Sequence, residues 1–160
     1  MAVTDAETRA LTAIQIGAIQ ERITSGGLIP VTVTGRSMIP TLRDRRDGVT
    51  LGPIEMWPPR RGEILFCRRD DGSPVMHRVI RIVGNGVILN GDGQVWMEGP
   101  IRRDMAIARV VMMRRGKRYV RVDRLLPRMW AVMWMAARPV RKRVFLLFRW
   151  VKRLISKKHY

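Results

Sequence analysis

The 160-residue chain has a single cysteine, Cys67. One thiol can form neither an intramolecular disulfide nor a cysteine cluster for zinc or an iron–sulfur centre, so we expect no metal and no cofactor. Long apolar runs are also absent, since the longest, Met129–Ala137, falls well short of the roughly 18 residues that a helix needs to cross a bilayer. The first residues, MAVTDAETRALTAIQIGAIQERITSGG, carry acidic and polar side chains where a secretory signal has an unbroken apolar core. The sequence therefore predicts neither a spanning helix nor a cleaved signal.

Acidic residues are scarce. The chain has 13 Asp and Glu against 31 Lys and Arg, a formal net charge of +18, and no acidic residue follows Asp123. Such a field attracts anionic partners, which include nucleic acid, acidic lipid headgroups and acidic peptides. The anion-seeking surface is expected mainly in the C-terminal part, and the charge itself does not predict a fold.

The N-terminal segment, residues 1–27, is expected to be an amphipathic helix. Thr4 and Glu7 have the spacing of a capping box, and apolar residues then recur at intervals of three and four. The pattern predicts a helix from about Asp5 to Ile23, which the following Ser-Gly-Gly sequence ends.

The middle segment, residues 28–122, has the periodicity of β-structure. Val31 and Val33 alternate with threonines in a short strand that leads into the turn Gly35-Arg36-Ser37. Further β-rich runs are separated by Gly, Asn and Asp turns and lie at Glu63–Cys67, Val75–Val83, Gly86–Leu89 and Ile107–Met113. The segment predicts a mainly β fold, a small antiparallel sheet or barrel.

The C-terminal segment, residues 123–160, interleaves Met, Trp, Leu and Phe with Arg and Lys. Prolines interrupt it, and two amphipathic helices are predicted, at about Arg128 to Ala137 and Val140 to Lys157. Aromatic and cationic residues on one helix are typical of an interfacial membrane segment, so residues 128–157 are expected to bind an anionic membrane surface. The alternatives are packing against the sheet, docking to a partner protein, and binding of nucleic acid, for which the chain has no recognised motif.

Three residues could carry hydrolytic chemistry. Ser37 follows a strand and a glycine, where its hydroxyl and nearby backbone N–H groups could face one carbonyl. His77 lies in a strand-like segment and is one of two histidines, the other being His159. Asp92, in the turn Asn-Gly-Asp-Gly, could orient an imidazole. Each also has a structural interpretation, as a turn serine, a strand histidine and a turn aspartate, and spacing alone does not decide between them.

Three segments together resemble the type I signal peptidases, in the superfamily that also contains the self-cleaving repressor proteases. They are GRSMIPTL at residues 35–42, RGEILF at 61–66 with MHRVI at 76–80, and LNGD at 89–92. The match spans about residues 28–113, and His-Arg-Val at 77–79 is similar to the histidine-base branch. The resemblance implies a signal-peptidase type of sheet with Ser37 as nucleophile, His77 as general base and Asp92 as the third member of the site.

By the same resemblance, the protein is expected to be a serine endopeptidase that cleaves a leader, signal or propeptide from a precursor peptide at a membrane surface. It is most similar to short, anchorless bacterial members, which implies a cytoplasmic enzyme that is peripheral on the inner face of the membrane. The family's hydroxyl or small residue is replaced by Gly35, which removes side-chain help to an oxyanion and leaves the backbone N–H of Ser37 as donor. The alternatives are a catalytically silent relative that binds a precursor peptide as a scaffold, and a nucleic-acid-binding protein.

Overall fold

The computed structural model describes residues 5–140 and 143, and their side chains from residue 14 onward. The helices are α1 (Asp5–Thr24) and α2 (Leu125–Ala136), with a short 3₁₀ helix, η1 (Arg103–Met105). The strands are β1 (Ile29–Thr32), β2 (Asp47–Gly52), β3 (Ile64–Arg68), β4 (Pro74–Val83), β5 (Gly86–Asn90), β6 (Glu98–Ile101), β7 (Ala106–Arg115) and β8 (Arg118–Arg121).

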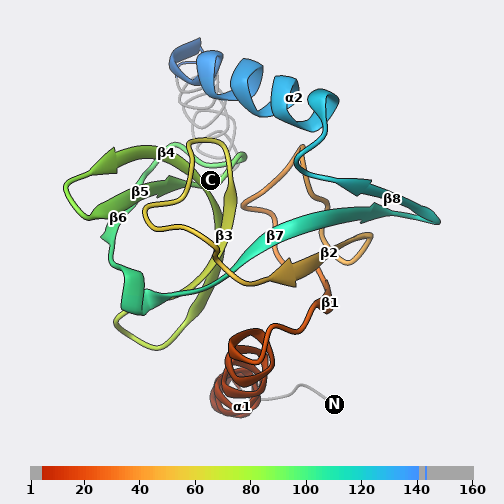
Figure 1. Cartoon of the computed structure of the whole chain (residues 1–160), viewed down its shortest axis with the longest axis vertical. Coiled ribbons are helices and arrows are strands. Elements are labelled where there is room, and N and C mark those ends of the chain that lie inside the picture. The colour runs from red at the N-terminus through yellow and green to blue at the C-terminus, as the bar shows by residue number, and fades with distance from the viewer. Residues whose placement is uncertain (1–4, 141–142, 144–160) are drawn as a thin grey trace, which may run out of the picture.

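The strands form one antiparallel sheet in the order β1-β2-β7-β3-β4-β5-β6, and β8 pairs with β7. The sheet is strongly curved (Figure 1). It is open, because within the described residues no pairing joins β1 to β6. The two helices lie on opposite sides of it (Figure 1). This confirms the predicted mainly β fold with an antiparallel sheet, an N-terminal helix and C-terminal helical structure, and shows the sheet to be open.

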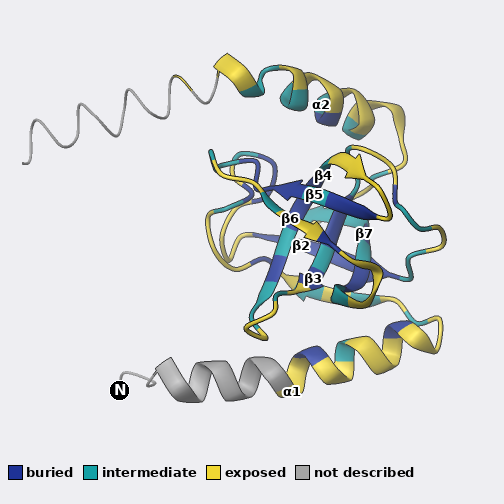
Figure 2. Ribbon diagram, turned by 90° about the vertical axis from the view of Figure 1, so that its left-hand side faces the viewer, coloured by how far each residue is buried: buried dark blue, intermediate teal, exposed yellow. Residues whose placement is uncertain are grey.

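The core consists of two clusters between the helices. In the first, buried residues of β2, β3 and β7 pack against Ile16 and Ile23 of α1. The second joins Leu65, Val79 and Leu89 of β3, β4 and β5. Figure 2 shows these buried strands between helices whose outer sides are exposed. Each fully buried aliphatic side chain stabilises the fold by about 1.5–3 kcal/mol.

Two strands do not stand out in the sequence. β2 is buried along its whole length and therefore lacks the alternation that marks a half-exposed strand. β6 contains Gly99 and Pro100, which are depleted in strands, but it lies at the sheet edge, where a missing N–H donor is tolerated.

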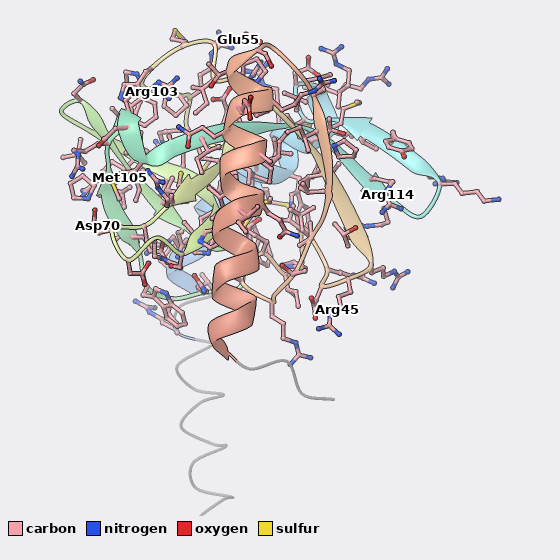
Figure 3. The ribbon with its side chains drawn as sticks, turned by 90° about the horizontal axis from the view of Figure 1, so that it is seen from below. Arg45, Glu55, Asp70, Arg103, Met105 and Arg114 are labelled. Carbon is pink, nitrogen blue, oxygen red and sulfur yellow. The ribbon has the colours of Figure 1, made fainter. Side chains whose placement is uncertain are left out.

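The predicted N-terminal helix is confirmed as α1, which lies across one side of the sheet when viewed from below (Figure 3). Ile16, Ile19 and Ile23 face the core, whereas Ile14 is 73% exposed. The helix ends at Thr24, and Gly26 just beyond it has a φ of 79°, which favours glycine. The expected capping contact between Thr4 and Glu7 lies outside the described residues and side chains.

The first predicted C-terminal helix corresponds to α2 and begins three residues earlier, at Leu125 rather than Arg128. Pro127 is tolerated there because it occupies the first turn, where backbone N–H groups have no intrahelical partner. The second predicted helix, Val140 to Lys157, lies outside the described residues apart from its first positions. Among the described helices, none combines the length and apolar character of a membrane span.

Candidate active site

Ser37 and His77 border the same cleft, which has a volume of about 470 Å³. Ser37 is partly exposed in the loop between β1 and β2. The start of this loop is fixed by a hydrogen bond of 2.9 Å from Gly35 N to Asp44 Oδ1. Gly35 has φ of 91°, which explains why glycine stands two residues before the serine.

The turn after β5 supports the serine loop through its backbone. Gly93 N donates a hydrogen bond of 2.7 Å to Ser37 O. A Cβ atom at Gly91 would lie 2.6 Å from Ser37 O, and one at Gly93 would lie 2.9 Å from Ile39 O. The two glycines flanking Asp92 thus allow this turn to pack directly against the loop that carries Ser37.

His77 lies on β4, opposite Leu65 of β3, and its side chain is 1% exposed. Burial lowers the pKa of His77 below its usual value of 6.5, and the charge of Arg69 lowers it further. The carboxylates of Glu98 and Asp92 act in the opposite direction and raise the pKa, without outweighing burial. The imidazole is therefore neutral at neutral pH, the state in which it can accept a proton.

The carboxylate next to the imidazole belongs to Glu98, which the sequence did not single out. His77 Nδ1 lies 3.6 Å from Glu98 Oε2, and no group of the described part of the chain is within hydrogen-bond distance of this buried nitrogen. Strand register explains the proximity, because Val79 pairs with Leu89 and Leu89 with Glu98, which places all three on the sheet face that His77 shares. A small rotation of the glutamate would complete a hydrogen bond to Nδ1.

Arg69 holds Glu98 in place. Its guanidinium donates two hydrogen bonds to the carboxylate, from Nε to Oε2 at 3.2 Å and from Nη2 to Oε1 at 2.5 Å. Arg69 is also the charged residue that lines the cleft beside His77 among those the structure describes. The arrangement is thus a chain of three groups, Arg69, Glu98 and His77.

Asp92, predicted as the third member of the site, is bound by Arg78 and Thr41. Its carboxylate accepts from Arg78 Nε at 2.9 Å, from Arg78 Nη2 at 2.6 Å and from Thr41 Oγ1 at 2.5 Å. The Arg78 and Asp92 side chains are only 4% and 2% exposed. Arg78 adjoins His77 in β4, so the two side chains point to opposite faces of the strand. The structure therefore places Ser37 and His77 at the cleft, Glu98 next to the buried Nδ1 of His77, and the Asp92 carboxylate next to Arg78.

The rest of the cleft suits an extended apolar peptide. Its wall includes Ile16 and Ile19 from α1, Phe66 from β3 and Met76 from β4. Residues 31–34, at and beyond the end of β1, form another wall. Within the described part of the chain β1 pairs only with β2, so its other edge has free backbone groups that could pair with an added strand.

Cys67 is not a candidate nucleophile. Burial, and secondarily the charge of Glu98, raise the pKa of its thiol to about 12. The thiolate is therefore not populated at neutral pH.

A scan against protein-family models, a search of curated proteins and a search of solved structures found no match to this chain. The similarity to signal peptidases thus stays a prediction based on the short segments described above.

Proposed function

We propose that the protein is a serine endopeptidase of signal-peptidase type, with Ser37 as nucleophile and His77 as general base. The observation that carries the proposal is that both residues line one cleft while a carboxylate, Glu98, lies at the other ring nitrogen of the histidine. A buried, neutral histidine between a serine and a carboxylate is the arrangement that acyl transfer requires.

The chemistry follows from the orientation of the imidazole. Because Nδ1 faces Glu98, Nε2 is the nitrogen that serves Ser37. Ser37 Oγ attacks the scissile carbonyl carbon while His77 Nε2 accepts the hydroxyl proton, and the same proton then passes to the leaving amine as the peptide bond breaks. Water, deprotonated by His77, hydrolyses the acyl-enzyme. Glu98 holds the Nδ1–H tautomer and stabilises the imidazolium, and the backbone N–H of Ser37 is the oxyanion donor.

The substrate is proposed to be a precursor peptide whose leader, signal or propeptide is removed. The apolar walls of the cleft and the free edge of β1 support binding of an extended, apolar segment. The resemblance to signal peptidases adds a preference for small side chains before the cleaved bond.

We place this activity at an anionic membrane, on its inner face. The outer side of α2 supports this, because its apolar side chains are exposed: Leu125, Leu126, Met129, Val132 and Met133. The flanking cations include Arg124 and Arg128, and no acidic residue follows Asp123. An exposed apolar stripe with cations and without acids matches the chemistry of an anionic bilayer interface.

Active-site labelling tests the proposal. The wild-type protein, Ser37→Ala and His77→Ala would be treated with a serine-directed phosphonate or an Ala-x-Ala peptide probe in the presence of anionic vesicles, and adducts mapped by mass spectrometry. One adduct on Ser37 that disappears in His77→Ala is expected, and Ser25→Ala is the matched control that keeps it. A folded wild-type protein without an adduct from either probe would refute the peptidase and favour a silent peptide-binding scaffold.

A further inference from the structure

Helix α2 and the residue that follows it contact Thr41, Asp92 and Asn90 through side chains spaced four residues apart. These three residues and Arg78 are called the framework of the cleft below. Trp130 Nε1 donates to Thr41 Oγ1 at 2.9 Å, and Trp134 Nε1 donates to Asp92 O at 3.2 Å. Arg138, just beyond the helix, donates from Nε to Asn90 Oδ1 at 3.3 Å. Four-residue spacing places Trp130 and Trp134 on one face of α2, and Arg138 adds a further contact just beyond the end of the helix.

The Thr41 hydroxyl is the junction of this network. It accepts from Trp130 Nε1 at 2.9 Å and from Arg78 Nη2 at 3.5 Å, which occupies both of its lone pairs. Its one proton is then directed to Asp92 Oδ2, 2.5 Å away. The indole therefore determines which way the hydroxyl points and which carboxylate oxygen it binds.

Each residue of this network lies close in sequence to Ser37, to His77 or to the glycine that binds the Ser37 backbone. Thr41 lies on the loop that carries Ser37, Arg78 follows His77 in β4, and Asp92 precedes the glycine whose N–H binds Ser37 O. A displacement of the junction would therefore move the nucleophile and the base relative to each other.

The backbone beside the junction is in contact with α2 as well. A Cβ atom at Gly62 would lie 3.5 Å from Ala131 Cβ and 3.4 Å from Met135 Cε, so the helix packs closely on this glycine. Gly62 O in turn accepts from Arg78 Nη1 at 2.8 Å. The stacked rings of Trp130 and Trp134, with centroids 5.3 Å apart, stiffen the same helix face.

We propose that Trp130 is a positioning residue for catalysis, acting through Thr41, and that the inner face of α2 clamps the framework that aligns Ser37 with His77. The proposal rests on the peptidase function stated above. It assigns the two sides of α2 different roles, since the inner face aligns the site and the outer face is left for the membrane.

The first test compares two tryptophan variants. Trp130→Phe keeps an aromatic ring next to Trp134 but removes the N–H donor, and we expect kcat to fall about tenfold with KM within about twofold. Trp57→Phe is the matched control, because it also removes an indole hydrogen bond, from Nε1 to Asn85 O at 2.8 Å, far from the junction. Wild-type kcat in Trp130→Phe, or an equal loss in Trp57→Phe, would overturn the proposal.

A double-mutant cycle tests whether the indole acts through Thr41. Thr41→Val should lower kcat, Thr41→Ser should restore it, and Trp130→Phe should cause no further loss in the Thr41→Val background. Independent, multiplicative losses would show that Trp130 does not act through the hydroxyl. Thermal unfolding of each variant separates loss of alignment from loss of folded protein.

An NMR measurement separates this proposal from the peptidase assignment. The protein has five tryptophans, so its indole N–H region can be assigned by single substitutions. Thr41→Val should shift the Trp130 indole signal and leave that of Trp57 unchanged. If the wild-type protein turns over no peptide, the proposed function fails; an unmoved Trp130 signal shows instead that the clamp is absent, whatever the activity.

Discussion

Replacing Glu98 by glutamine keeps the size of the side chain and removes its charge, which makes it the sharpest probe of the site. In a serine–histidine–aspartate triad, loss of the orienting carboxylate lowers kcat by about 10⁴-fold. Here Glu98 Oε2 lies 3.6 Å from His77 Nδ1 and the carboxylate is also bound by Arg69, so its hold on the imidazole is weaker. We expect a fall of about 10²- to 10³-fold, equivalent to about 3–4 kcal/mol of transition-state stabilisation.

The pH dependence of kcat/KM should shift in a defined direction when Glu98 or Arg69 is replaced. The charge of Glu98 raises the pKa of His77 and that of Arg69 lowers it. Activity requires the neutral imidazole, so kcat/KM should rise with pH through an apparent pKa below 6.5. Glu98→Gln should move this acid limb to lower pH, and Arg69→Gln should move it to higher pH.

The assay is cleavage of a fluorogenic peptide with small residues before the cleaved bond, measured from pH 4.5 to 8. The matched control is Glu55→Gln, which removes another carboxylate that is paired with an arginine, Arg109, outside the cleft. Wild-type kcat in Glu98→Gln, or an acid limb displaced to higher pH, would refute the placement of Glu98 beside the base.

Three further results are expected. Asp92→Asn should lower the free energy of unfolding in urea by about 3–5 kcal/mol, because it leaves the buried Arg78 guanidinium without its counter-charge, and a loss below 1 kcal/mol would contradict the described pair. On acidification the free energy of unfolding should begin to fall near pH 6.5, because His77 takes up its proton more readily in the unfolded chain, and His77→Gln should flatten this part of the curve. Leu126→Glu should weaken sedimentation with anionic vesicles while leaving cleavage of a soluble peptide unchanged, and an unaltered vesicle affinity would exclude the outer face of α2 as the docking surface.

Local sequence patterns predicted the elements whose signals are local. Alternation indicated β1, β-rich composition indicated β4, and glycine-rich turns separated β4 from β5, while apolar residues at intervals of three and four indicated α1. Buried on both faces, β2 has no alternation to detect. Whether the sheet closes depends on the pairing of its first and last strands, which no local pattern records.

Short sequence segments likewise indicated some residues of the candidate site and missed another. Ser37 and His77 stand out because they lie in two short segments, GRSMIPTL and MHRVI, that resemble the signal peptidases. Glu98 does not, because its place beside the imidazole results from register across β4, β5 and β6 and so depends on contacts distant in sequence. Asp92, in its glycine turn, is the carboxylate that the resemblance to signal peptidases implied as the partner of the base. Arg78 binds the Asp92 carboxylate, and the charge of Asp92 still raises the pKa of His77.

The C-terminal segment shows why two sequence interpretations could both hold. Packing against the sheet and lying on a membrane were alternatives for the same Met and Trp residues. In α2 the tryptophans point inward, where Trp130 and Trp134 bond to the framework, while Met129 and Met133 are more than half exposed on the outer side. A helix with 3.6 residues per turn separates residues one position apart by about 100° and thereby divides neighbouring apolar residues between two surfaces. The composition of such a segment predicts that it is buried against a surface, and only the helix phase decides which residues face the protein and which stay exposed.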